Sequence, residues 1–188
     1  MNNIPIMFII LCWGIYLLYW AVSSFSQKPS TEKPKSVSYF VAVFLFGSSF
    51  MMILVPELFN LSAIPINKSL LLDITSMLIC ASGLAVCVWA RTNLAGNWSN
   101  TLDFKKGHEL IQSGPYKLIR HPIYAGFLLM FLGSAMATSK LGGIIGFVIL
   151  LAGCLLRIRL EEDLMMKHFP VEYCEYKKNT KALVPFLW

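Results

Sequence analysis

Two short groups of polar residues, in an otherwise apolar chain, carry side chains that could do chemistry. The first group is RHPIY at 120–124. Proline suits the first position of a helix and disfavours helix in the residue before it, so Pro122 should begin a helix with His121 just outside it. The free amides and positive dipole end of that helix would form an anion site beside His121, Tyr124 and Arg120. Alternatively, Arg120 and Tyr124 are anchors at a membrane interface and His121 is a solvated cap.

The second group is RIRLEED at 157–163. Arg157 and Glu161 are four residues apart, so in a helix they lie on one face. If this guanidinium and carboxylate face the group around His121, they could hold a zwitterionic ligand. Glu162 and Asp163 point elsewhere and are expected to form a solvated face.

The elements that must position these groups are membrane helices. Hydrophobic residues make up 56% of the 188 residues and charged residues 14%, which is too apolar for an ordinary soluble domain. We expect an all-α, polytopic membrane protein with about five transmembrane helices, because hydrocarbon offers no water to unpaired backbone groups and no segment alternates like a barrel strand. The first segment lacks a basic leader and a small-residue cleavage site, so we expect it to be a retained helix. The expected spans are 4–22, 39–59, 69–90, 122–138 and 141–158.

The helical pattern of the last span continues beyond its apolar part to Phe169, just before Pro170. A helix over 141–169 would be about 43 Å long, whereas the hydrocarbon is roughly 30 Å thick. Its last turns should therefore project from the membrane towards the polar connector over 91–121.

The basic residues predict the orientation. The stretches 23–38, 91–121 and 157–188 hold three, five and six of them, which is 14 of the 16. Positive charge is preferentially retained in the cytoplasm, so we expect the N-terminus outside and the C-terminus, with the active site, inside. Basic loops against anionic lipid account for the net charge of +6, and neither a nucleic acid partner nor a metal is expected.

Two longer motifs resemble a known family. GHELIQSGPYKLIRHPIYAG at 107–126, then RIRLEEDLMMKHFPVEYCEY at 157–176 and a VPFLW ending, are similar to the isoprenylcysteine carboxyl methyltransferase family, especially its short prokaryotic members. The resemblance covers about residues 87–188. The RHPxYxG element alone is shared with phospholipid N-methyltransferases and, more loosely, with membrane sterol reductases, whereas the order of all the elements narrows the resemblance to this family.

The resemblance implies one integral membrane methyltransferase domain over 1–188, with three spans in 1–90 and a cofactor-binding half with two spans and a cytoplasmic tail in 91–188. It implies S-adenosyl-L-methionine as cofactor and an isoprenylcysteine-like carboxylate as acceptor, with Arg157 as the catalytic residue that orients the acceptor; Arg120 is the second residue expected to bind it. The acidic run is shorter than in the eukaryotic enzymes, which leaves Glu162 as an alternative register to Glu161. The expected cofactor-binding residues are His108, Glu109, Leu110, Ile111, Tyr116, His121, Pro122, Ile123, Tyr124 and Glu161.

The chemistry of these residues is compatible with methyl transfer. Glu161 can pair the cofactor's ammonium, and Arg157 can bind a carboxylate in a bidentate geometry that lysine cannot copy. A carboxylate acceptor needs no general base, whereas a phospholipid amine or a thiol would have to be deprotonated. Small residues on the last two spans, Gly126, Gly133 and Gly142, suggest a sideways entrance for a lipophilic acceptor.

Two other classes of function remain as alternatives. One is an NADPH-dependent membrane reductase of the sterol type, although the sequence has no dinucleotide-binding fingerprint. The other is a membrane scaffold or transporter subunit without enzymatic activity, although a transporter would be expected to show an internal repeat.

Overall fold

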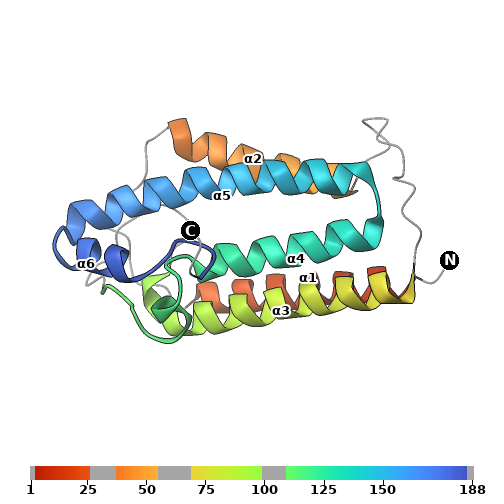
Figure 1. Ribbon diagram of the computed structural model, residues 1–188, viewed down its shortest axis with the longest axis horizontal. Helices are drawn as coiled ribbons and strands as arrows, with labels where there is room; N and C mark the ends of the chain where they lie inside the picture. Colours follow the sequence, from red (N-terminus) through yellow and green to blue (C-terminus); the bar gives the residue numbers. More distant parts are fainter. Residues whose placement is uncertain (1–2, 26–36, 55–68, 99–108, 186–188) are drawn as a thin grey trace.

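The computed structural model describes residues 3–25, 37–54, 69–98 and 109–185, and there the prediction of an all-α fold is confirmed. Within these ranges the only extended pairing is an isolated parallel bridge between Ile119 and Lys181. Figure 1 shows long helices running alongside one another, with the short α6 at one end of the bundle. The helices are α1 (Ile4–Ser24), α2 (Val37–Leu54), α3 (Leu70–Leu94), α4 (Pro122–Thr138), α5 (Leu141–His168) and α6 (Glu172–Asn179), with short 3₁₀ turns at Ala95–Asn97 and Gly114–Lys117.

The helix boundaries agree closely with the sequence pattern. Helix α4 begins at Pro122 and ends at Thr138, as predicted, because the proline fixes the backbone for a first helical turn. Helix α5 ends at His168, one residue before the predicted end. Its 28 residues extend over about 42 Å, so its last turns reach beyond a hydrocarbon layer of roughly 30 Å. The end of the second predicted span, 55–59, lies outside the described residues.

The helices have the length and surface of membrane spans. Within the described residues, α1, α3 with the turn that follows it, and α5 are long and apolar enough to cross a membrane, and α2 and α4 are shorter apolar helices. Large apolar side chains are exposed on the outside of the bundle, where water would solvate them poorly and lipid solvates them well. The chain is therefore an integral membrane protein. Examples of these exposed side chains are Leu11, Leu18, Phe44, Leu78 and Val148.

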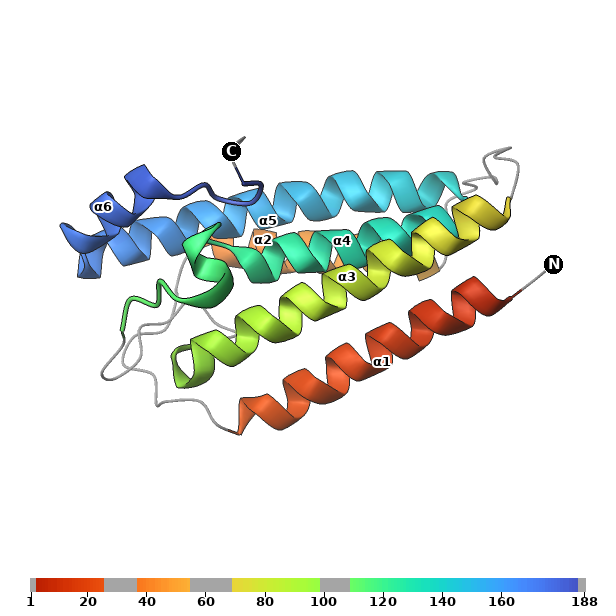
Figure 2. The same ribbon diagram turned by 60° about the horizontal axis from the view of Figure 1, so that its bottom comes forward.

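The helices pack in the spatial order α2, α5, α4, α3, α1. Figure 2 shows α5, α4, α3 and α1 following one another from a second side. Glycines bring α3 and α4 into close contact. A Cβ atom on Gly83 would lie 2.5 Å from the carbonyl oxygen of Gly126, and one on Gly133 would lie 2.6 Å from that of Ser76. Small residues allow such approach between membrane helices. The expected acceptor entrance at Gly126 and Gly133 is therefore wrong, because α3 occupies that face.

The described parts of the segments that carry most of the basic residues meet at one end of the bundle. Arg91, near the end of α3, donates from Nη2 to the carbonyl of Ser23 in α1 at 2.7 Å and from Nη1 to the carbonyl of Ala95 at 2.6 Å. These contacts satisfy carbonyls that helix ends leave without partners. At the same end, α6 and the connector lie beside the end of α5 (Figure 1). That this end faces the cytoplasm stays a prediction.

We expect Gly83→Ala to destabilise the bundle by about 1–3 kcal/mol, because the added methyl group must push α3 away from the backbone of α4. The measurement is the midpoint of thermal unfolding of the detergent-purified protein. Gly14→Ala in α1 is the matched control, since a Cβ atom there meets nothing within 4 Å. Equal midpoints for the two variants would contradict a close α3–α4 contact.

Candidate functional site

A cavity of about 520 Å³ lies at the end of the bundle where α6 packs. It is large enough for a cofactor-sized ligand. The structure brings together at this cavity the two polar groups that are separated by more than 30 residues in the sequence. Of the predicted site residues, those that line it are Glu109, Leu110, Ile111, Tyr116, Arg120, His121, Ile123, Tyr124, Arg157 and Glu161.

One described residue that was predicted to bind the cofactor, Pro122, is not in this lining. Pro122 is fully buried in the first turn of α4, where it starts the helix. His108 lies outside the described residues. The contribution of both residues to a ligand site stays a prediction.

Tyr124, Arg157 and Glu161 form the inner ionic group of the cavity. The hydroxyl of Tyr124 donates to Oε1 of Glu161 and accepts a hydrogen bond from Nε of Arg157 at 2.8 Å. Nη2 of Arg157 also lies 3.4 Å from Oε1 of Glu161, which confirms that these two side chains share one face of the helix. The guanidinium lies over the ring of Tyr39 from α2, 5.6 Å from its centre. The carboxylate of Glu161 and the guanidinium of Arg157 are therefore held next to each other at the cavity.

His121 lies between two carboxylates. Its Nδ1 is 3.5 Å from Oε2 of Glu161, and its Nε2 is 3.3 Å from Oε1 of Glu162. Only 8% of the residue is exposed, so the alternative of a solvated cap is wrong. Burial lowers the pKa of this imidazole, but the contacts with the two glutamates outweigh burial and raise the pKa above its ordinary value. With an acid facing each nitrogen, His121 is placed to act as a doubly donating imidazolium.

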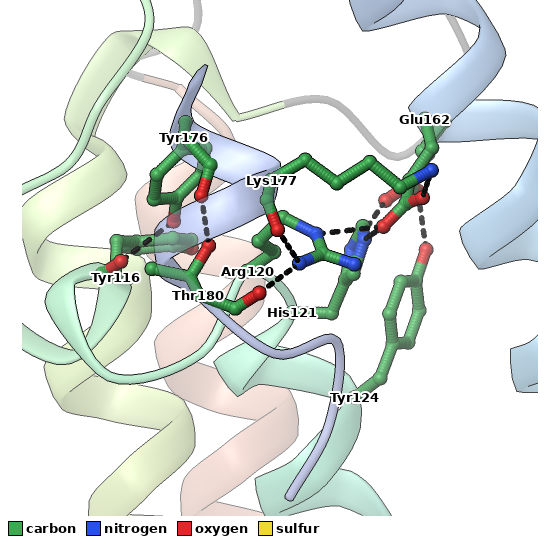
Figure 3. Close-up of polar contacts among 9 residues, drawn as sticks. Tyr116, Arg120, His121, Tyr124, Glu162, Tyr176, Lys177 and Thr180 are labelled. Atoms are coloured by element: carbon green, nitrogen blue, oxygen red, sulfur yellow. Dashed lines mark hydrogen bonds and ion pairs between the residues drawn. The ribbon is translucent and has the colours of Figure 1, made fainter. Parts of the chain in front are cut away.

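Glu162 is not part of a solvated face, and this expectation is wrong. Its carboxylate is buried, with Nε of Arg120 at 2.8 Å from Oε1 and Nζ of Lys177 at 2.6 Å from Oε2. Figure 3 shows Arg120 of the connector and Lys177 of α6 reaching Glu162. Helical periodicity missed this cluster because it depends on α6 turning back against α5. Asp163 is exposed, as expected.

The C-terminal segment is attached to the connector that carries the site. The amide of Arg120 donates to the carbonyl of Lys181 at 2.8 Å, and the hydroxyl of Tyr176 donates to the carbonyl of Tyr116 at 2.6 Å. Nη1 of Arg120 also donates to the carbonyls of Thr180 and Lys177. Arg120 therefore borders the cavity with much of its hydrogen-bonding capacity already used by the protein, whereas its predicted contact with an acceptor stays untested.

The sequence did not predict the aromatic wall of the cavity. Tyr16 and Trp20 of α1 stack with their ring centres 4.2 Å apart, and Trp98 meets Trp20 edge-on at 6.1 Å. The spacing of four residues between Tyr16 and Trp20 was the available signal, but aromatic residues near the end of a membrane helix are as readily explained by anchoring at the interface. The remaining apolar lining includes Leu17, Val43, Phe46, Phe127 and Leu164.

Comparison with known proteins adds a family and several relatives. A family model described as phospholipid methyltransferase matches residues 72–172. Protein-S-isoprenylcysteine O-methyltransferase A of Arabidopsis thaliana is 31% identical over 87 residues, which cover 46% of this chain and 44% of that protein. The cobalt-zinc-cadmium resistance protein CzcN of Cupriavidus metallidurans is 35% identical over 103 residues, which cover 53% of this chain and 43% of that protein.

The matched part spans less than half the length of either relative. A solved structure of the eukaryotic intramembrane Ras methyltransferase ICMT is 23% identical, with a TM-score of 0.49 over 82% of this chain and 54% of that one. The family match includes α3, α4 and α5, and with them both polar groups of the cavity. Because this match covers more than half of the residues, the chain belongs to the phospholipid methyltransferase family.

Proposed function

We propose that this protein transfers a methyl group from S-adenosyl-L-methionine to the carboxylate of a lipophilic, isoprenylcysteine-like acceptor by in-line displacement. The observation that carries the proposal is the position of Arg157 and Glu161, side by side on a cavity that also has an aromatic and apolar wall. The family assignment and the name of the Arabidopsis relative support the same chemistry.

The residues around the cavity fit the charges of S-adenosyl-L-methionine, which supplies an electrophilic methyl group when it is bound. Glu161 has 28% of its side chain exposed, and its carboxylate can pair with the cofactor's ammonium. The amides at the start of α4, which no side chain caps, can bind the cofactor's carboxylate. The stacked rings of Tyr16 and Trp20 offer an aromatic surface to a flat heterocycle.

A carboxylate is the acceptor that the ionic group supports best. Transfer from a sulfonium to a carboxylate removes both charges, so a cavity of low dielectric that excludes water favours the step. Arg157 can hold and orient the carboxylate, which the enzyme must chiefly align with the methyl group. An amine or thiol acceptor would need a base, but both nitrogens of His121 already face carboxylates. A phospholipid amine is therefore the second candidate, because the family description names phospholipids.

The remaining features extend the proposal to the whole chain. We infer one domain over 1–188, with the cavity on the cytoplasmic side because 14 of the 16 basic residues lie in segments expected there. The inferred partners are membrane lipids and a lipidated acceptor. A nicotinamide reductase and a scaffold without activity are the competing classes.

We expect the protein, purified in nanodiscs, to bind radiolabelled S-adenosyl-L-methionine and not NADPH. Glu161→Gln should weaken this binding about 10- to 100-fold, because it removes a charged partner of the ammonium. Equilibrium dialysis of both ligands is the measurement. The exposed Asp163→Asn, two residues along the same helix, is the control and should bind like the original protein. Preferential binding of NADPH would contradict the proposed function.

We expect Arg157→Lys to lower kcat/KM for a farnesylcysteine acceptor about 10- to 100-fold, because lysine keeps the charge but loses the two-point contact with a carboxylate. The affinity for S-adenosyl-L-methionine should change much less. The measurement is methyl transfer from labelled cofactor to farnesylcysteine, phosphatidylethanolamine and a small thiol in parallel. Arg159→Lys, at an exposed position on the same helix, is the control. Faster transfer to phosphatidylethanolamine than to farnesylcysteine would favour the second candidate.

A further inference from the structure

Glu162 is a buried carboxylate that the proposed reaction does not use. Glu161, one residue before it, borders the cavity, whereas Glu162 does not. Its two oxygens are instead fully engaged by the protein, with Arg120 and His121 at Oε1 and Lys177 at Oε2. A buried carboxylate is costly unless it is paired in this way, so its presence beside the site calls for a function.

The geometry connects Glu162 to the cavity through a single ring. Nε2 of His121 faces Glu162 at 3.3 Å, and Nδ1 on the other side of the ring faces Glu161 at 3.5 Å. An imidazole with an acceptor on each side can satisfy both only when both nitrogens carry protons. The ring therefore joins a carboxylate that borders the cavity to one that is buried outside it.

We propose that Glu162 is a positioning residue that holds His121 as an imidazolium and, through it, fixes the orientation of Glu161 towards the cofactor. Arg120 and Lys177 keep Glu162 in place and attach it to the connector and to α6. The expected effect of Glu162 on cofactor binding rests on the proposed function. Its expected effect on the protonation of His121 does not.

The protonation of His121 determines the expected pH dependence. Because its pKa is raised, the charged interactions of His121 are complete below its ordinary pKa and are lost as the pH rises through the raised value. Cofactor binding should therefore weaken on the alkaline side. Among the described residues, the charged and titratable groups that face His121 or its partners are Glu161, Glu162 and Arg157 of α5, Tyr124 of α4, Tyr116 and Arg120 of the connector, and Tyr173 and Lys177 of α6.

The test is an NMR titration of the histidines of the full chain in nanodiscs. The protein has three histidines, and the signal of His121 is assigned from its loss in His121→Gln. Glu162→Gln should lower the pKa of His121 by about one pH unit or more, because it removes a negative charge next to the ring. The alkaline loss of S-adenosyl-L-methionine binding should move to lower pH by the same amount, and Glu162→Asp should restore part of both effects.

Two matched variants separate positioning from a general loss of structure. Lys177→Met removes a cation that shares Glu162 with His121, so it should raise the pKa of His121, opposite to Glu162→Gln. Asp163→Asn and Lys178→Met, at exposed neighbouring positions, should leave the pKa of His121 unchanged.

An unchanged pKa of His121 in Glu162→Gln, or a lower one in both Glu162→Gln and Lys177→Met, would overturn the proposal. If the original protein binds no S-adenosyl-L-methionine at any pH while the titrations behave as expected, the proposed function fails and the link between Glu162 and His121 stands.

Discussion

The constraint on which the site depends is that two consecutive carboxylates, the half-buried Glu161 and the buried Glu162, lie at the end of a membrane helix. Glu161 and Glu162 point to opposite sides of His121, and neither can remain ionised without nearby positive charge. Arg157 lies one helical turn before Glu161 and supplies part of that charge from the same helix. The rest comes from Arg120 and Lys177, which belong to segments distant in sequence. Pairing the two acids therefore requires the connector and α6 to fold against α5.

This requirement explains why a bundle of membrane helices carries an ordered polar end. Helix α5 is longer than the hydrocarbon is thick, so its last turns and both glutamates can lie where polar segments reach them. Beyond the helix, α6 returns, and backbone hydrogen bonds from Arg120 and His121 to Lys181 and Ala182 fix the C-terminal segment to the start of α4. The close α3–α4 contact at Gly83 fixes the two helices that the connector joins. The apolar packing thus provides the rigid frame on which the ionic group is assembled.

The sequence predicted the parts of this arrangement that depend on local rules. Pro122 determines where α4 begins, and the four-residue spacing of Arg157 and Glu161 determines that they share a face. The burial of Glu162 could not be predicted in this way, because it depends on where α6 turns after α5. The aromatic wall was missed for a similar reason: the stacking of Tyr16 on Trp20 is local, but only the packing of α1 shows that it faces the cavity. The glycines of α4 were wrongly connected with acceptor entry, because only the packing of α3 shows that they face that helix.

One part of the cavity is formed by residues that the family model matches, and another part by residues outside the match. Residues 72–172 contain Tyr124, Arg157 and Glu161, the ionic group suited to the cofactor and to a charged acceptor atom. Among the helices outside the match, α1 and α2 contribute aromatic and apolar side chains such as Trp20 and Phe46 to the opposite wall. Relatives with names as different as an isoprenylcysteine methyltransferase and a metal-resistance protein are similar to this chain over only about half of its length. In the proposed function, an ionic group on α4 and α5 with a separate apolar wall on α1 and α2 lets the wall change with the shape of the acceptor without disturbing the paired carboxylates.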